Sequence, residues 1–365
     1  MEDLQELICE LVAIESVNPD LVPSGSGESR IAAFVAEWLE AAGLAVSVVS
    51  PVPGRPSVVG VVQGSGGGSS LMLNAHMDTV GAGGMASAFS PVVRDGRVYG
   101  RGSYDMKASL AAIMLAARRC VSSGLRGDVV VTAVADEEAA SIGTSAVLSS
   151  FHADFGIVTE PTELALCLAH KGFVWLEVET HGVAAHGSRA DLGVDAIAHM
   201  GPILSGVMAL GERLRSGPRH GLLGTGTLHA SLIEGGQEMS TYPARCVAKL
   251  ERRTVPGEDG ASVLREIEAL MGSAPAVARV TLERPPSEVA PDDPLAVAVE
   301  QAAGHPPLIG VAYWMDMALL NAAGIPCVAF GPSGGGEHAD VEWVDVASVE
   351  KCVDVYVRVA LELCN

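Results

Sequence analysis

Over the first 160 residues, the spacing of apolar and polar positions changes from block to block along the chain. Blocks with the spacing of a helix alternate with blocks typical of a strand. Apolar side chains recur every three to four residues in the helical blocks, whereas the extended blocks are short runs of small and β-branched residues. The pattern predicts helices at 2–15, 27–43, 106–119 and 141–149, and strands at 45–50, 56–62, 70–76, 129–135 and 155–159. This alternation indicates an α/β fold in which helices cover a largely parallel sheet.

The segment from about residue 175 to 283 differs, because its strands alternate between apolar and polar side chains. Its strands and helices form two β-α-β units, which predicts a small α+β domain of the split-βαβ, ferredoxin-like kind. Buried strands return after the proline-rich "RPPSEVAPDDP", for example in "GIPCVAF". We therefore predict an α/β domain made of residues 1–174 and 284–365, interrupted by an inserted domain at 175–283.

The glycine-rich stretch "QGSGGGSS" at 63–70 could suggest a dinucleotide-binding loop. The G-x-G-x-x-G spacing fails at Ser69, and the stretch joins two predicted strands rather than a strand and a helix. It predicts a flexible hairpin connection.

Composition supports a large folded protein. The 365 residues are 48% hydrophobic and 18% charged, which allows a sizeable core and makes two domains the natural expectation. The net charge of −21, without any Lys/Arg-rich stretch, argues against nucleic acid or an anionic membrane as a partner. The acidic balance also suits a protein that binds cations.

The seven cysteines are scattered, odd in number and never form a C-x-x-C pair. This pattern favours free thiols in a reducing compartment over a disulfide framework or a thiolate zinc site. The N-terminal segment resembles an amphipathic helix rather than a signal peptide, and no apolar run reaches membrane-spanning length. We expect a cytoplasmic protein.

Candidate chemistry begins with "VVVTAVADEEAAS" at 129–141, where a buried strand runs into Asp136, Glu137 and Glu138. Folding does not require three adjacent carboxylates, and a solvated acidic loop would be the simplest interpretation of this stretch alone. The segment "LMLNAHMDTV" repeats the pattern, since its strand ends in His76 and Asp78. Residues two apart on a strand point the same way, so Asp78 can orient the His76 ring.

Three further residues extend the pattern. Asp105 precedes a helix, where it could also be an N-cap; Glu160 ends the strand in "GIVTEPT"; and His338 lies on a glycine-rich loop after "CVAF". Ligand sites of open α/β sheets gather beyond the carboxyl ends of the strands. We therefore expect these side chains to meet at one site.

Imidazole and carboxylate donors without a thiolate suit two divalent ions, Zn²⁺ above all, or Co²⁺ or Mn²⁺. We assign His76 and Glu160 to one ion, Glu138 and His338 to the other, and Asp105 as the bridge. Three carboxylates against two dications leave one positive charge, which a bridging hydroxide neutralises, and such a site generates a nucleophilic hydroxide. Neighbouring side chains diverge at a strand end, so Glu137 stays off the metal and is the expected general base, while Asp136 is expected to be structural.

With these residues in place, the chain resembles the M20 metallopeptidase family. The resemblance spans nearly the whole chain and rests on ten motifs: "LVAIESVNP", "LNAHMDTV", "YGRGSYDMK", "ADEEAASIGT", "VTEPT", "AHKG", "HGVAAHGS", "GVDAI", "ERRTVPGE" and "FGPSGGGEHADVEWV". It implies the same metal ligands, with Glu137 as base and Asp78 beside the metal-bound His76. It also implies a cis peptide between Asp105 and Met106.

The resemblance further implies that the inserted domain is a lid and dimerisation domain, so a homodimer is expected. His186 matches a histidine that, in dimeric members, crosses to the partner's active site and stabilises the oxyanion. Arg253 matches the arginine that holds the substrate carboxylate, with Arg252 as a nearby alternative. Ser240 stands where the family usually has Asn, and Ala108 where it usually has Gly, so the substrate contacts differ.

The expected activity is that of a dinuclear, metal-dependent amidohydrolase that cleaves an N-acyl amino acid, acetylornithine-deacetylase-like. Within the family, a glutamate at the position of Glu160 tends to accompany deacylases and carboxypeptidases rather than aminopeptidases. An M20 dipeptidase or a carboxypeptidase G-like enzyme is the alternative. A non-catalytic protein that kept the fold would be expected to have lost metal ligands, and none is missing here.

Overall fold

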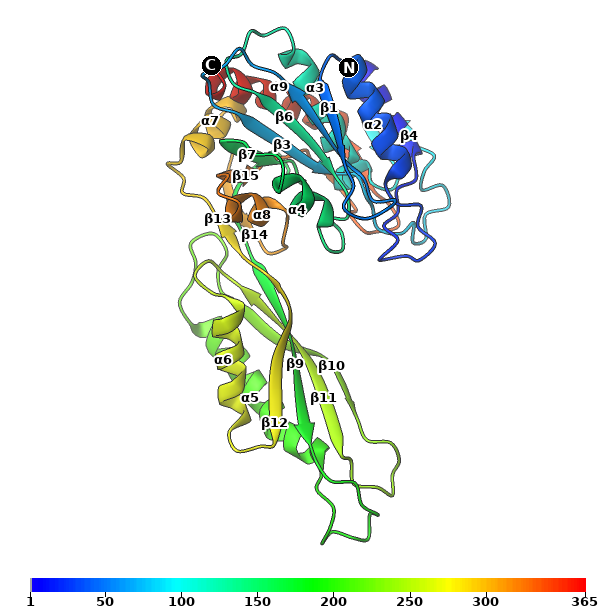
Figure 1. Cartoon of the computed structure of the whole chain (residues 1–365), viewed down its shortest axis with the longest axis vertical. Coiled ribbons are helices and arrows are strands. Elements are labelled where there is room, and N and C mark those ends of the chain that lie inside the picture. The colour runs from blue at the N-terminus through cyan, green and yellow to red at the C-terminus, as the bar shows by residue number, and fades with distance from the viewer. Residues whose placement is uncertain (1) are drawn as a thin grey trace. The chain divides into compact units, whose positions relative to one another are not determined.

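The computed structural model describes residues 2–365, and the chain forms two compact units (Figure 1). The first contains the chain up to Leu168 together with Val289–Ile309 and Met315–Asn365. The second contains Ala169–Glu288 and Gly310–Trp314, and is therefore an insertion in the chain of the first. No helix among residues 2–365 is both long and apolar enough to cross a bilayer.

A mixed sheet forms the centre of the first unit, with strand order β1-β2-β6-β3-β7-β15-β8. Its central strands run parallel, and the strands on either side run antiparallel to their neighbours. The parallel strands are β6 (Val129–Val134), β3 (Leu71–His76), β7 (Phe155–Val158) and β15 (Cys327–Ala329). The others are β1 (Ala45–Val49), β2 (Ser57–Val62) and β8 (Leu166–His170), and β13 (Ser287–Glu288) and β14 (Leu308–Val311) also pair with β8.

The expectation of a largely parallel sheet is thus correct only for the centre. β1 and β2 are joined by a short connection, which suits a hairpin, whereas a parallel pair needs a crossover of a dozen or more residues. The hairpin predicted at 63–70 is wrong, because β6 lies between β2 and β3 and pairs with both. The glycine-rich stretch instead packs closely on residues 125–127, where a Cβ at Gly127 would lie 1.8 Å from the Ser69 carbonyl oxygen.

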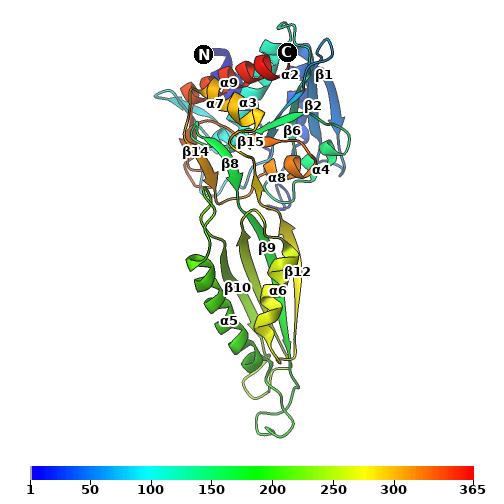
Figure 2. The same ribbon diagram turned by 90° about the vertical axis from the view of Figure 1, so that its left-hand side faces the viewer.

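Helices cover both faces of this sheet (Figures 1 and 2). β3 and β6 are buried at every position, as expected for parallel strands between two helical layers. One layer contains α1 (Glu2–Ala13), α3 (Ala108–Cys120), α7 (Pro294–Ala303) and α9 (Val346–Leu363). The other contains α2 (Ser29–Ala41), α4 (Ile142–Leu148) and α8 (Met317–Ala322).

A small second sheet of the first unit joins two distant parts of the chain. Its order is β16-β17-β5-β4, and Trp343 of β17 pairs with Tyr99 of β5. The strands are β4 (Val92–Arg94), β5 (Arg97–Tyr99), β16 (Gly334–Gly335) and β17 (Trp343–Asp345). This pairing places the loop after β16 beside the turn that follows β5.

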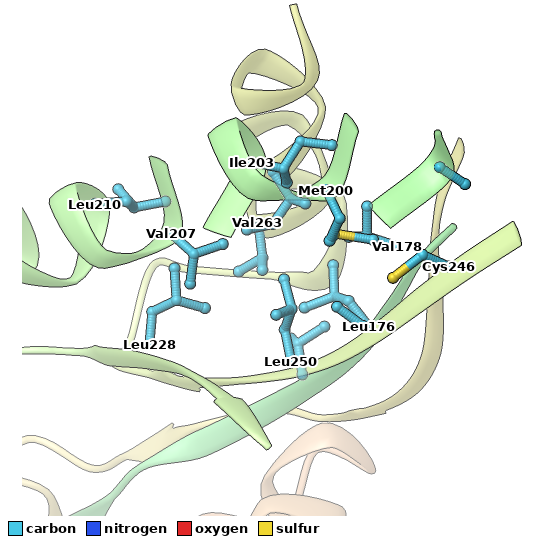
Figure 3. Close-up of a cluster of buried hydrophobic side chains, with 14 residues drawn as sticks. Leu176, Val178, Met200, Ile203, Val207, Leu210, Leu228, Cys246, Leu250 and Val263 are labelled. Atoms are coloured by element: carbon cyan, nitrogen blue, oxygen red, sulfur yellow. The ribbon is translucent and has the colours of Figure 1, made fainter. Parts of the chain in front are cut away.

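The second unit has a four-stranded antiparallel sheet of order β10-β11-β9-β12, with two helices on one face (Figure 2). The elements follow one another as β9 (Gly172–His181), α5 (Ala196–Ser216), β10 (Thr227–Gly235), β11 (Arg245–Thr254), α6 (Gly260–Met271) and β12 (Ala276–Arg284). This order and topology are those of the expected split-βαβ fold. Figure 3 shows its core, in which Leu176 and Val178 of the sheet pack against Met200, Ile203 and Val263 of the helices.

Candidate metal centre

The carboxyl ends of the parallel strands gather the predicted site residues of the first unit. β3 ends at His76, the acidic "DEE" segment follows β6, and Glu160 lies two residues beyond β7. Two further residues come from loops next to the small sheet: Asp105 lies between β5 and α3, and His338 lies between β16 and β17. Residues separated by up to 262 positions, from 76 to 338, thereby meet in one place.

Asp105 lies between the two histidines. Its Oδ1 is 3.0 Å from Nε2 of His76, and its Oδ2 is 3.4 Å from Nε2 of His338. Glu160 Oε1 lies 3.7 Å from His76 Nε2, and Glu138 Oε2 lies 3.2 Å from His338 Nε2. The five side chains thus form two groups that share Asp105, and the possible ligand atoms of each group lie within 4.8 Å of one another.

The donor set fits two divalent cations. Each group offers one imidazole nitrogen and two carboxylates, the ligands that Zn²⁺, Co²⁺ and Mn²⁺ accept. Oε1 of Glu138 is buried and has no hydrogen-bond partner among the described residues. An unsatisfied carboxylate oxygen is costly to bury, and a cation would satisfy it.

Electrostatics point the same way. Burial and the neighbouring carboxylate of Asp105 raise the pKa of Glu160 and of Glu138. Hydrogen bonds to Asp105 and Glu138 raise the pKa of His338 to about 10. Burial opposes the charged form of His76, but its bonds to Asp105 and Asp78 outweigh that effect and raise its pKa as well. The site therefore has a strongly negative potential that favours bound positive charge.

The two glutamates after β6 have separate surroundings. Glu138 faces His338, whereas the pKa of Glu137 is raised well above its usual value, first by burial and then by the charges of Glu160 and Asp316. The backbone N–H groups of Glu137 and Glu138 donate to Oδ1 and Oδ2 of Asp78, at 3.1 and 3.2 Å. Asp78 therefore orients the acidic turn.

Asp78 contacts the His76 ring more closely through its backbone carbonyl than through its carboxylate. Nδ1 of His76 lies 2.9 Å from the backbone carbonyl oxygen of Asp78 and 3.5 Å from its carboxylate. The fully buried carboxylate also accepts a hydrogen bond from Asn18 Nδ2 at 2.8 Å. The same Asn18 nitrogen donates to Asp136, which also accepts from Arg55, so Asp136 has structural partners.

The N-cap alternative for Asp105 does not hold. α3 begins at Ala108 with Lys107 as its N-cap, and Asp105 itself has extended backbone angles (φ −115°, ψ 93°). The peptide bond between Asp105 and Met106 is cis, as the resemblance implies.

His186 and Ser240, two of the predicted residues in the second unit, lie on neighbouring backbone segments. His186 forms an isolated bridge with Thr241, and the backbone N–H of Gly187 donates to the carbonyl oxygen of Ser240 at 2.6 Å. His186 is exposed, and its Nδ1 lies 2.8 Å from the Ser188 hydroxyl. This bond leaves Nε2 as the ring atom available to a ligand.

The neighbouring arginines of β11 differ in their surroundings. Arg252 is buried, and its two terminal nitrogens donate to Glu258 and to the carbonyl oxygen of Arg253. Its Nε lies 3.6 Å from a carboxylate oxygen of Glu266. The Arg253 guanidinium is 5.0 Å above the Phe173 ring, and its Nε donates to Glu251 at 2.8 Å. Of these two arginines, Arg252 therefore has its terminal nitrogens engaged by the protein, whereas the protein contacts of Arg253 are made by its Nε and by the face of its guanidinium.

Several site residues could not be found from their own sequence neighbourhood. Asn18 and Arg55 support the acidic turn, and Arg101 and Glu342 support the turn that carries Asp105. Their polar side chains lie in loops, where exposed residues of the same kind are common. The available signal was the family resemblance: Asn18, Arg101 and Glu342 lie within the motifs that carry it, whereas Arg55 lies outside all of them.

A model of peptidase family M20/M25/M40 matches residues 72–362 of this chain. The chain belongs to this family. Among M20 relatives, acetylornithine deacetylase from Proteus mirabilis is 28% identical over 366 residues, which cover 94% of this chain and 92% of the relative.

Solved structures agree with the fold of this M20 protein. Aminopeptidase PepT from Bacillus cereus matches with a TM-score of 0.82 and 18% identity, over 100% of this chain and 99% of that chain. A Bacillus subtilis structure, described as a dinuclear metal-binding peptidase of the M20 family, matches with a TM-score of 0.71 and 17% identity, over 99% and 97%. The M20 chain is thus a hydrolase with a mixed α/β fold that acts on amide bonds and has candidate metal-binding groups.

Proposed function

We propose that this M20 hydrolase is a two-metal amidohydrolase that removes the acyl group from an N-acyl amino acid, with an acetylornithine-deacetylase-like activity. The observation that carries the proposal is the position of Asp105, whose two carboxylate oxygens face two different histidines. A carboxylate in that position can bridge two cations. The relatedness to acetylornithine deacetylase over 94% of the chain supports the substrate class.

His76 and Glu160 would hold one ion, Glu138 and His338 the other, and Asp105 would be shared. Zn²⁺ is the ion that this donor set favours, with Co²⁺ or Mn²⁺ as alternatives. When bound, the two metal ions would supply Lewis acidity and lower the pKa of water, so that a hydroxide nucleophile exists near neutral pH. The Bacillus subtilis neighbour described as dinuclear supports a pair of ions rather than one.

Glu137 is the proposed general base. Its raised pKa suits a group that takes a proton from the attacking water and then delivers it to the nitrogen of the departing amine. Asp78 holds the backbone of Glu137 and Glu138, so it positions the base and a ligand together. Asp78 is therefore a positioning residue for both.

Substrate recognition is assigned to the second unit. Arg253 would bind the carboxylate of the amino acid, because its guanidinium is held by Glu251 and Phe173 with its outer N–H groups unused by them. His186 would donate to the oxyanion of the tetrahedral intermediate, as the resemblance implies. Ser240, next to His186 along the paired backbone, would contact the substrate in place of the usual asparagine.

We further propose a homodimer formed through the second unit, which would act as the lid and dimerisation domain at 175–283. Edge strand β10 is exposed along almost its whole length and carries exposed Leu232 and Ile233. An exposed apolar edge is suited to pairing with a second copy. Sedimentation of Leu232→Lys should show monomers where the wild type is dimeric. The seven free cysteines favour a cytoplasmic location.

The test is a screen of the zinc- and cobalt-loaded protein against N-acetylated amino acids and dipeptides. We expect turnover of N-acyl amino acids, with a preference for substrates that keep the free carboxylate. A dipeptidase or carboxypeptidase would use the same residues, because a peptide also presents an amide near a carboxylate. Faster turnover of peptides than of every acylated amino acid would replace the deacylase assignment with a peptidase.

A further inference from the structure

One buried side chain organises the turn that carries Asp105. Glu342, which directly precedes β17, accepts hydrogen bonds from three backbone N–H groups of this turn. Its Oε2 accepts from Gly102 at 2.9 Å, and its Oε1 accepts from Tyr104 at 2.9 Å and from Asp105 at 3.0 Å. The turn is not regular helix or strand, so Glu342 replaces the main-chain acceptors that regular structure would provide.

Arg101 completes the arrangement. Its Nη1 donates to Glu342 Oε2 at 2.7 Å, its Nη2 to the Ala339 carbonyl oxygen at 2.9 Å, and its Nε to the Gly81 carbonyl oxygen at 3.0 Å. The two charged side chains are 2% and 1% exposed. A buried ion pair is costly unless its remaining donors and acceptors are satisfied, and here both oxygens of Glu342 have two partners each.

These bonds connect two loops that bring ligands to the metal centre. Glu342 lies four residues after His338, and Ala339, which Arg101 binds, directly follows His338. In the other loop, the backbone N–H of Asp105 itself donates to the Glu342 carboxylate. The carbonyl oxygen of Glu342 also accepts from the Gly100 N–H at 3.2 Å, so main chain and side chain act together.

We propose that Glu342, together with Arg101, is a positioning residue of the metal centre that sets the placement of Asp105 relative to His338. The inference rests on the proposed two-metal site and adds to it residues that do not face the cations. Groups that orient metal ligands in this way typically affect metal affinity by about 10–100-fold.

If Arg101 and Glu342 formed only a structural ion pair, their loss would lower stability without affecting one metal ion's affinity more than the other's. A positioning role predicts an unequal effect. His338 belongs to one group only, whereas His76 and Glu160 come from buried strand ends that Glu342 does not touch. Because Asp105 is shared, its displacement affects both ions, but the ion held by Glu138 and His338 also loses the placement of His338. Loss of Glu342 should therefore weaken binding of that ion more than binding of the other.

The experiment titrates metal-free protein with Zn²⁺ against a chromophoric chelator, at a temperature where circular dichroism shows every variant folded. The wild type should bind two zinc ions. Glu342→Gln places an amide NH₂ against N–H donors and should weaken one of the two binding steps by about 10–100-fold, and the other step less. Asp345→Ala is the matched control, because it removes the cap of α9 three residues further along and should leave both steps unchanged.

A wild type that binds fewer than two zinc ions would overturn the proposed metal site itself. Two zinc ions in the wild type and unchanged affinities in Glu342→Gln would overturn the positioning role alone, as would an equal loss in both steps. If Glu342→Gln does not fold, Arg101→Lys takes its place, because one ammonium cannot serve Glu342, Ala339 and Gly81 together. Wild-type affinities in Arg101→Lys would then overturn the inference, and a loss larger in one step than in the other would support it.

Discussion

The carboxylate of Asp78 accepts a hydrogen bond from the backbone N–H of Glu137 at 3.1 Å, although the two residues follow different strands of the sheet. Its other oxygen accepts from the N–H of Glu138 at 3.2 Å. The residue that flanks His76 thus also holds the proposed base and a proposed ligand. Asp78 thus contacts three functional groups: its carboxylate binds the two glutamate N–H groups, and its backbone carbonyl binds His76.

Replacing this carboxylate should impair catalysis more than binding. In Asp78→Asn one oxygen becomes an NH₂ group that faces N–H donors, so the turn with Glu137 must shift. We expect kcat to fall by about 10–100-fold with little change in KM. Steady-state kinetics on an N-acyl amino acid measure both. Asp128→Asn is the matched control, since Asp128 also accepts a backbone N–H, from Gly64, away from the site.

Glu137→Gln should separate catalysis from metal binding. Glu137 belongs to neither of the two candidate ligand groups, so the variant should retain its metal. The amide cannot accept a proton, and turnover should fall by about 100- to 10,000-fold. Elemental analysis and activity on the same sample measure the two effects. Glu138→Gln should instead lose part of its metal; equal metal loss in both variants would contradict the division of roles.

The two arginines of β11 should respond differently to substitution. Arg253→Met should raise KM by about 10- to 100-fold, the effect of losing a charge-assisted hydrogen bond, with little change in stability. Arg252→Met leaves Glu258 and Glu266 without their buried partner and should lower the unfolding free energy by about 3 kcal/mol. Kinetics and urea denaturation of both variants test this, and a larger KM effect at Arg252 would reverse the assignment.

His170 should make stability depend on pH. Burial lowers its pKa to about 4, partly offset by its hydrogen bond with the Lys171 carbonyl. An unfolded histidine has a pKa of about 6.5, so between these values the unfolded chain binds the proton and the folded chain does not. The contribution of His170 to the free energy of unfolding is therefore fully present above pH 6.5 and decreases as the pH falls towards 4.

His170→Phe keeps a ring against Trp314 but cannot take up a proton. Between pH 7 and pH 4.5 the wild type should lose about 2 kcal/mol more unfolding free energy than the variant. Urea denaturation at the two pH values measures the difference. Parallel losses in the two proteins would show that His170 does not titrate as its burial indicates.

Much of the fold was predictable because its periodicity is local. The buried strands β3, β6 and β7 are short apolar runs, and each is followed within a few residues by a His or a carboxylate. The direction of each strand was harder to predict, because a buried run of valines has the same sequence pattern whether the neighbouring strand is parallel or antiparallel. β2 shows this, since only its pairing with β6 reveals that the connection to β3 is not a hairpin.

The candidate metal ligands could be predicted from residue type and position, whereas the hydrogen bonds that support them could not. Nothing near Glu342 in the sequence indicates that it binds the backbone of Asp105, 237 positions away. The same holds for Asn18, which reaches Asp78 over 60 positions. Hydrogen bonds of this kind depend on the assembled sheet. The choice between Arg252 and Arg253 likewise needed the surroundings of each guanidinium.

The distribution of the thiols offers a way to follow the two units separately. Six of the seven cysteines are buried, and Cys246, in the core of the second unit, is the only one of those six outside the first. A thiol-reactive label should therefore modify half-buried Cys9 in the native protein and reach the others only through opening of the chain. The labelling rate of Cys246, compared with that of Cys327 or Cys352, would report whether the inserted unit opens on its own while the first unit stays closed.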